Sequence, residues 1–433
     1  MADSTNASRA PSDVFVLKSR RASGHRSRPW RALLGSVLLP FLASCGDNYN
    51  SCYNCGVTPF EVSPGVVAGE FNGNGFTSVI ALSAVEPGPA VGPDYLKVYL
   101  SSGAGSFAPP VYVADGVDPL YLASADLNGD GLPDVVSASF SDGALRVFFN
   151  DKNNPGTLNA PLVLSSPGAS QVAIGDMNND GMPDLVSADY GVSLFLQTSP
   201  GVFAAPISLY SGGANWVAVG DLNGDGAMDV ALTDSVGVKV LLHTGASSST
   251  TFAPPVSVFT ESANANAIGA NLIAIADVNG DGASDLIITD PGSIGGAGPT
   301  VNILLQNTAI PGTFRAPVSY LIAAQDLSQS IVVTDVDGDG RPDIVIGGLQ
   351  TVTVLLQNHS PAAPGTYMAA AIYTAPGANE IAVADINGDG KPDIVVSNGV
   401  TNPLVNGVVT TNPGVLLQNA AAPGTFGALQ NLP

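Results

Sequence analysis

Basic residues, histidine and cysteine are all scarce in this chain of 433 residues. Its 14 Lys and Arg stand against 36 Asp and Glu, which gives a formal net charge of −22. Such an acidic surface repels the phosphate backbone of DNA and RNA, so we expect no nucleic-acid partner. With 3 His and 3 Cys, the chain also has little material for a zinc site, which usually takes four such ligands.

Catalytic signatures are scarce as well. His25 lies in the basic N-terminal segment, and we expect His243 and His359 to be exposed turn residues and not acid-base groups. The sequence has no G-x-S-x-G elbow, and no glycine-rich loop stands at a strand-to-helix junction. Paired carboxylates remain as a possible catalytic device. We therefore expect a protein that is not an enzyme, with a polysaccharide-degrading hydrolase or lyase as the alternative.

A nine-residue loop of acidic and amide residues recurs along the chain. Residues 385–393 read D-I-N-G-D-G-K-P-D, with oxygen-bearing side chains at positions 1, 3, 5 and 9 and glycine at position 6. Oxygen ligands on a flexible loop suit Ca²⁺ better than zinc, copper or magnesium, and the glycine permits a sharp turn. The predicted metal ligands are Asp126, Asn128, Asp130, Asp134, Asp176, Asn178, Asp180, Asp184, Asp221, Asn223, Asp225, Asp229, Asp277, Asn279, Asp281, Asp285, Asp335, Asp337, Asp339, Asp343, Asp385, Asn387, Asp389 and Asp393.

A seventh loop, residues 70–78, begins with Glu70 and ends with Ser78. It keeps the glycines of the turn but lacks most of the acidic positions, so we expect it to bind calcium poorly or not at all. The chain should therefore hold about six Ca²⁺ ions. The loops begin 45 to 58 residues apart, a spacing that indicates a repeat architecture.

Short β-branched runs flank each loop, for example residues 381–383 and 394–396, which places the loop at the tip of a β-hairpin. A third run follows, and then a turn with Gly-Thr-Phe and often proline, as in residues 312–317, announces a fourth strand on the outer edge. Four antiparallel strands repeated seven times predict an all-β, seven-bladed β-propeller over residues 66–433. Either residues 426–432 or residues 59–62 could supply the last outer strand.

The loop between two strands, followed by G-T-F-x-A-P, resembles the FG-GAP or VCBS repeats of integrin-α-like propellers. This resemblance covers about residues 66–433 and rests on a long motif that recurs in register. It implies a calcium-stabilised propeller used in binding or adhesion at cell surfaces, without common catalytic residues. The loop that begins at Glu70 departs from the pattern.

The N-terminus carries an export signal. Residues 1–31 hold half of the Lys and Arg, and an apolar run over residues 32–44 follows them, too short to span a bilayer. The run ends in L-A-S-C-G, which resembles the bacterial lipobox and implies that Cys45 becomes lipid-modified. We expect a signal peptide over 1–44, a tether over 45–65, and an outer-membrane or cell-surface lipoprotein. A soluble secreted protein is the alternative.

Cys52 and Cys55 lie in the expected tether. A zinc site would need two further ligands, and no histidine or cysteine is near. A local disulfide and a pair of free thiols both remain open for these two cysteines.

Two classes of function remain. The first is a surface-anchored, monomeric binding module for a protein or glycan partner at the envelope or outside the cell. The second is an enzyme that degrades polysaccharides in the funnel of the propeller. Aromatic rings on one face could stack against sugars, although most should pack between blades, and Trp216 in particular is expected in the core. The aromatic residues considered are Tyr95, Phe140, Tyr190, Tyr210, Trp216, Tyr320, Tyr367 and Tyr373.

Overall fold

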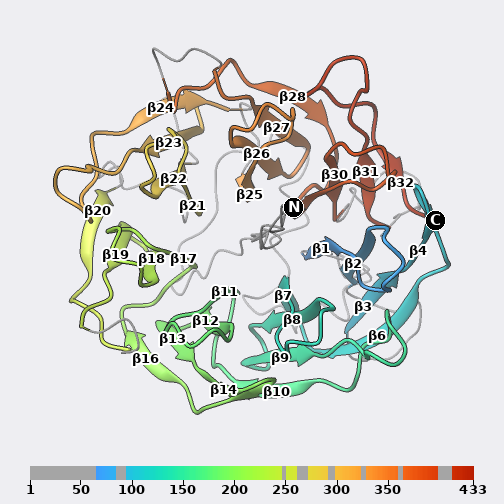
Figure 1. The fold of residues 1–433 in the computed structure, drawn as a ribbon, viewed down its shortest axis with the longest axis horizontal. Helices are drawn as coiled ribbons and strands as arrows, with labels where there is room; N and C mark the ends of the chain where they lie inside the picture. Colours follow the sequence, from blue (N-terminus) through green and yellow to red (C-terminus); the bar gives the residue numbers. More distant parts are fainter. Residues whose placement is uncertain are drawn as a thin grey trace, which may run out of the picture.

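The computed structural model describes residues 65–83, 94–245, 250–260, 272–290, 298–322, 328–358, 364–397 and 412–433. Over these residues the chain forms β-strands and no helix, in seven four-stranded antiparallel sheets set around a ring (Figure 1). The predicted seven-bladed β-propeller is confirmed. The predictions for the signal peptide, Cys45, the pair Cys52 and Cys55, and His359 lie outside the described residues.

Each blade is built from strands that follow one another in the chain. Blade 1 contains β1 (Val66–Gly69), β2 (Ser78–Ser83), β3 (Asp94–Tyr99) and β6 (Val111–Gly116); blade 2 contains β7 (Pro119–Ala125), β8 (Asp134–Ser139), β9 (Ala144–Phe148) and β10 (Leu162–Ser165). Blade 3 contains β11 (Gln171–Gly175), β12 (Asp184–Ala188), β13 (Val192–Phe195) and β16 (Ile207–Tyr210); blade 4 contains β17 (Trp216–Gly220), β18 (Asp229–Thr233), β19 (Gly237–Leu241) and β20 (Val256–Thr260). Blade 5 contains β21 (Ile273–Ala276), β22 (Asp285–Asp290), β23 (Thr300–Leu304) and β24 (Val318–Leu321); blade 6 contains β25 (Ser328–Thr334), β26 (Asp343–Gly348), β27 (Thr351–Leu355) and β28 (Ala371–Thr374). Blade 7 contains β29 (Ile381–Ala384), β30 (Asp393–Val396), β31 (Gly414–Leu416) and β32 (Gln430–Asn431), and two small hairpins pair β4 (Ser101–Gly103) with β5 (Ser106–Phe107) and β14 (Gln197–Ser199) with β15 (Val202–Phe203).

Burial follows the position of a strand within its blade. The second strand β8 is buried at every residue, whereas the outer strand β10 alternates between half-buried and exposed residues. Pro161, Pro206 and Pro317 directly precede the outer strands β10, β16 and β24. The missing N–H of proline costs little there because an outer strand has no further neighbour.

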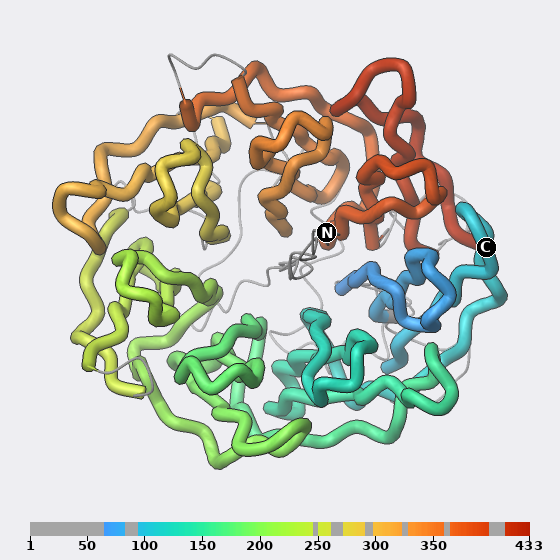
Figure 2. Tube along the Cα trace, viewed as in Figure 1, coloured from blue at the N-terminus to red at the C-terminus, as the bar shows by residue number. Residues whose placement is uncertain are grey.

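The ring is closed between blade 7 and blade 1, whose inner strands β29 and β1 lie in contact (Figure 2). The outermost strand of blade 7 is β32, which comes from the C-terminal end of the chain. Of the two predicted closures, the C-terminal one is therefore present, and residues 59–62 lie outside the described part. Apolar side chains fill the spaces between blades, and Trp216, with 1% of its surface exposed, is among them as predicted.

No helix in the described part of the chain is both long and apolar enough to cross a membrane.

Candidate metal centres

The seven nine-residue loops all lie on one face of the ring. Each of them follows the inner strand of its blade, and the inner strands run in the same direction. Positions 4 and 6 adopt positive φ in each loop, as at Gly338 (+80°) and Gly340 (+85°). Asn179, at +55°, is the non-glycine residue at position 4, and asparagine tolerates this conformation better than most residues. The predicted role of the glycine at position 6 is confirmed.

Main-chain N–H groups hold the carboxylates of each loop in place. In blade 6, Asp335 Oδ1 accepts hydrogen bonds from the N–H groups of Gly338 (2.7 Å) and Asp339 (3.1 Å), and Asp335 Oδ2 accepts one from Gly340 (2.7 Å). Asp337 Oδ1 accepts from Asp339 N (3.1 Å), and Asp339 Oδ1 accepts from Arg341 N (2.8 Å). The same pattern recurs in the loop that begins at Asp385. The loop is thus shaped by its own backbone, and its acidic oxygens are gathered at one point.

The ninth aspartate of each intact loop is buried and ties the loop to its blade. Asp343 Oδ2 accepts a hydrogen bond from Val336 N (2.9 Å), and Asp343 Oδ1 accepts one from Gln357 N (2.7 Å), just after β27. The equivalent pairs of bonds are made by Asp134, Asp184, Asp229, Asp285 and Asp393. Sequence reasoning treated this residue as a closing ligand only. The apolar strand that starts at each ninth aspartate was the signal for its burial.

The chemistry of the donors fits a hard divalent cation. Ligand atoms of Asp335, Asp337 and Asp343 all lie within 4.8 Å of one another. The donors are oxygens throughout, and in the other five intact loops an asparagine amide replaces the carboxylate at position 3. Oxygen-only sites of this kind suit calcium. The residues at the predicted positions therefore could hold Ca²⁺, with the loop of blade 6 carrying the most negative charge.

Burial changes how the ninth aspartates titrate. It raises the pKa of Asp134, Asp184, Asp229 and Asp285 from 3.8 to about 6, and that of Asp343 to about 7, against the opposing effect of the backbone hydrogen bonds. The neighbouring carboxylates of the same loops raise these pKa values further. The folded chain without metal therefore holds protons that the unfolded chain has already lost.

We expect metal-free protein to lose stability as pH rises. Because the folded pKa is raised, the stabilisation is complete below about pH 4 and is lost as pH passes through 6 to 7. Protein stripped of metal by dialysis should therefore unfold at a higher temperature at pH 5 than at pH 8 in calorimetry. Calcium should reverse this order because it competes with protons for the same oxygens. A metal-free midpoint that rises from pH 5 to pH 8 would contradict this account.

The loop of blade 1 is held without a full set of carboxylates. Ser78 Oγ accepts a hydrogen bond from Ser101 N (3.0 Å), which replaces one of the bonds made by the ninth aspartate elsewhere. The side-chain amides of Asn72 and Asn74 both donate to Ser101 O (2.8 Å each). Amide donors therefore bind the loop to the rest of blade 1 directly. That this loop binds calcium poorly or not at all stays a prediction.

A glutamine after the third strand links neighbouring blades, and sequence reasoning missed it. Gln306 Nε2 of blade 5 donates to Leu222 O in the loop of blade 4 (2.7 Å) and to Ser284 O in its own loop (3.0 Å). Gln357 and Gln418 make equivalent bonds to the preceding blades, and Asn150 does so in blade 2. The recurrence of Gln or Asn at this position of the repeat was the available signal.

The prediction for His243 is wrong. His243 occupies the glutamine position in blade 4, and only 3% of its surface is exposed. Its ring lies edge-on to Phe252, with the ring centres 5.4 Å apart, and its main-chain N–H donates to Asp229 Oδ1 (2.6 Å). The position had been assigned to a turn, but it is buried beside Phe252 and the ninth aspartate of its own blade.

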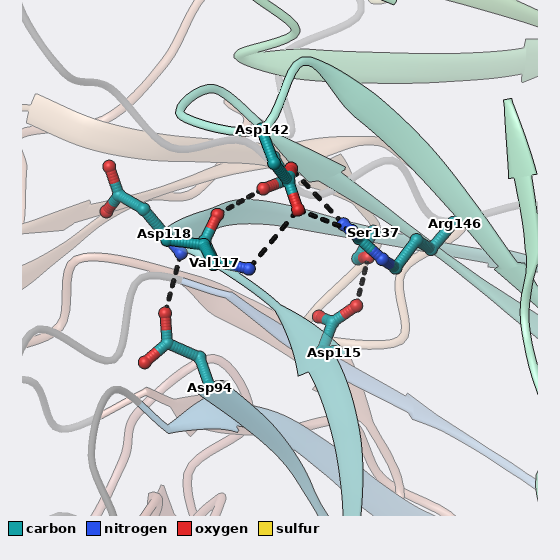
Figure 3. A network of polar contacts seen from close by, with 8 residues as sticks. Asp94, Asp115, Val117, Asp118, Ser137, Asp142 and Arg146 are labelled. Carbon is teal, nitrogen blue, oxygen red and sulfur yellow. Dashed lines mark hydrogen bonds and ion pairs between the residues drawn. The ribbon is translucent and has the colours of Figure 1, made fainter. Parts of the chain in front are cut away.

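A second polar cluster lies on the face opposite the loops, between blades 1 and 2 (Figure 3). Asp142 forms an ion pair with Arg146 and accepts a hydrogen bond from Val117 N (3.3 Å). Asp118, at φ +55°, donates its N–H to Asp94 Oδ2 (2.6 Å). These contacts fix the connection from β6 to β7.

Asp115 lies beneath this cluster and is fully buried. Its Oδ1 accepts a hydrogen bond from Ser137 Oγ of blade 2 (2.6 Å) (Figure 3). Burial raises its pKa to about 7, while Ser137 and Arg146 lower it. Asp115 thus links blade 1 to blade 2 by a buried polar contact.

Comparison with known proteins agrees with this geometry. The FG-GAP-like repeat model matches six overlapping stretches, residues 70–137, 126–187, 176–232, 221–288, 277–346 and 335–396. The chain belongs to the FG-GAP-like repeat family. A comparison with curated proteins gives no match. The FG-GAP-like assignment thus rests on the repeats and on the fold.

Several solved structures are similar to this chain at low sequence identity. An Agrocybe aegerita lectin that recognises non-reducing terminal N-acetylglucosamine is 20% identical, with a TM-score of 0.50 over 73% of this chain and 80% of the lectin. A Lactobacillus plantarum protein is 13% identical (TM-score 0.48; 74% and 87% of the two chains). The Vibrio cholerae biofilm matrix protein Bap1 is 14% identical (TM-score 0.43; 79% and 85%).

Proposed function

We propose that this FG-GAP-like propeller is an exported, calcium-stabilised binding module that recognises a carbohydrate at the bacterial envelope and carries out no catalysis. The calcium loops stiffen one face of the ring and are not themselves the recognition site. The opposite face carries the recognition surface. The alternative of a protein partner is an outcome of the test below.

The observation that carries this proposal is an aromatic pair with one exposed ring on the face opposite the loops. Tyr190 has 69% of its surface exposed, and its ring meets that of Phe140 edge-on, with centres 6.3 Å apart. Both residues lie in turns that follow the second strands of blades 2 and 3, at the end of the blade away from the loops. An exposed aromatic ring suits stacking against a sugar ring.

Hydrogen-bonding groups lie next to this pair. Ser141 directly follows Phe140 and donates its hydroxyl to Asp118 Oδ2 (2.7 Å), and Asp142 comes next in the same turn. Carbohydrate recognition usually combines an aromatic platform with a few fixed polar groups. The structurally similar Agrocybe aegerita lectin recognises a sugar, so the fold is compatible with this function.

A glycan array tests the proposal. We expect calcium-loaded mature protein to bind one class of glycans. Tyr190→Ala should reduce that binding about five- to thirtyfold through loss of a stacking contact worth about 1–2 kcal/mol. Tyr112→Ala, which removes a ring that is 48% exposed on the outer strand β6, should leave binding unchanged. Binding to an envelope protein with no glycan bound would overturn the carbohydrate assignment. Equal losses in both variants would show that the surface is wrongly placed.

Anchoring at the envelope is a separate prediction. We expect Cys45→Ser to move the protein from the membrane fraction to the soluble exported fraction, because a thioether-linked lipid would no longer form. Fractionation followed by immunoblotting measures this change, with Cys52→Ser as the matched control. An unchanged membrane fraction for Cys45→Ser would show that the chain is secreted or held by another contact.

A further inference from the structure

One position of the inner strand forms a ring around the axis of the propeller. In each blade, one residue of the inner strand pairs with the ninth loop position. The residue four places before it has the same register in every blade. Its seven members are Gly65, Tyr121, Gln171, Trp216, Leu272, Ser330 and Glu380. We call this set the axial ring. All seven residues are buried, and they lie at the end of the channel opposite the calcium loops.

Contacts between blades that are not neighbours show that this ring reaches the axis. Tyr121 of blade 2 and Trp216 of blade 4 meet edge-on with ring centres 6.0 Å apart, although blade 3 stands between them. Glu380 of blade 7 acts electrostatically on Tyr121, although blade 1 stands between them. Blade 1 supplies only Gly65 at this level, which has no side chain. The side chains of the ring therefore converge on one another across the channel.

The axial ring contains buried oxygens that accept no hydrogen bond. Both carboxylate oxygens of Glu380 and the hydroxyl of Ser330 make none with any described residue. Gln171, by contrast, is satisfied, because its Oε1 accepts from Val217 N (3.0 Å) and its Nε2 donates to Val172 O (3.2 Å). A buried carboxyl group without a partner is costly, and native proteins rarely keep one without a ligand or ion.

The main chain around Glu380 is fixed, so the carboxylate cannot easily turn away. Glu380 N donates to Ser397 Oγ (3.0 Å), and Ser397 N donates to Glu380 O (2.9 Å). Burial raises the pKa of Glu380 well above its usual value, and burial followed by the charge of Glu380 raises that of Tyr121. Both shifts come chiefly from burial without a compensating positive charge, since the ring has no Lys, Arg or His.

We propose that the axial ring binds one compact monovalent cation, such as potassium, sodium or ammonium, between Glu380 and Tyr121. One carboxylate balances one positive charge, and a divalent ion would need more carboxylates than this ring supplies. The hydroxyls of Tyr121 and Ser330 add neutral oxygens, and aromatic rings favour a cation close by. The edge-on contact between the Tyr121 and Trp216 rings limits the space for a larger ligand. This site is independent of the calcium loops and of the glycan surface.

Thermal unfolding of calcium-saturated protein tests the proposal. At equal ionic strength, the unfolding midpoint in KCl, NaCl or NH₄Cl should be a few degrees higher than in tetramethylammonium chloride. The tetramethylammonium ion is too large for the ring. Glu380→Gln should abolish this increment, and it should also raise the midpoint in tetramethylammonium because no buried charge remains. Asp151→Asn, which removes one carboxylate in a turn outside the ring, should keep the full increment. The differences among the three salts identify the ion.

A second measurement keeps the proposal testable if Glu380→Gln does not fold. Crystals of the wild-type protein soaked in rubidium chloride should show an anomalous peak between Glu380 and Tyr121, and Tyr121→Phe should weaken the increment in the unfolding midpoint. No salt-specific increment, or an increment that persists in Glu380→Gln, would overturn the proposal. Glu380 would then be a protonated acid, and the ring would have a structural role only.

Discussion

Protein stripped of calcium at pH 7.5 is expected to unfold about 10–20 °C below the calcium-loaded protein. Each occupied site stabilises the fold by about 2.7 kcal/mol when calcium is at a hundredfold excess over its Kd, and six loops multiply this effect. Removal of calcium also exposes repulsion within each intact loop, because the loop brings three or four carboxylates together. Calorimetry before and after removal of metal measures the shift.

Magnesium is the matched control for calcium removal. It carries the same charge but demands a stricter octahedral shell, so it should restore only part of the lost stability at the same concentration. Isothermal titration should show about six calcium equivalents per chain, with the blade 6 loop, which has Asp335, Asp337, Asp339 and Asp343, binding most tightly. A metal-free midpoint equal to that of the loaded protein would contradict the stabilising role.

Features that repeat along the chain could be predicted from the sequence. Each loop stands between β-branched runs, so the hairpin, the glycines with positive φ and the seven blades all followed from local pattern. The prolines before outer strands followed in the same way. Local sequence determined these features, and the sequence of each blade predicted the same hairpin and strands independently.

Features that depend on contact between blades could not be predicted in this way. His243 was placed in an exposed turn because its neighbours in sequence look like a turn, but blade packing buries it. Glu380 and Tyr121 are 259 residues apart in numbering and share a site only because the ring closes. Asp115 meets Ser137 because blades 1 and 2 pack side by side. A single sequence does not state which positions of different repeats face the same axis.

The ninth aspartate has two roles that one substitution can separate. As a proposed calcium ligand it acts only when the ion is bound, whereas as an acceptor for Val336 N and Gln357 N it acts at all times. Asp343→Ala leaves both buried N–H groups without an acceptor, at a cost of about 1–3 kcal/mol each. We therefore expect Asp343→Ala to destabilise even the metal-free protein by about 2–6 kcal/mol in denaturant unfolding.

Asp339→Ala in the same loop is the matched control for this substitution. Asp339 Oδ1 accepts a hydrogen bond from the exposed N–H of Arg341 (2.8 Å), which water can replace. Its loss should therefore cost less than about 1 kcal/mol without metal but should weaken calcium binding to blade 6. Asn74→Ala in the blade 1 loop should leave metal binding unchanged. It should lower the free energy of unfolding by no more than about 1 kcal/mol. If Asp343→Ala and Asp339→Ala were equally mild in metal-free protein, the buried carboxylate would serve the ion alone. The link from loop to blade would then have to be carried by the Gln357 side chain, which donates to Pro342 O in its own loop and to Val278 O in the preceding blade.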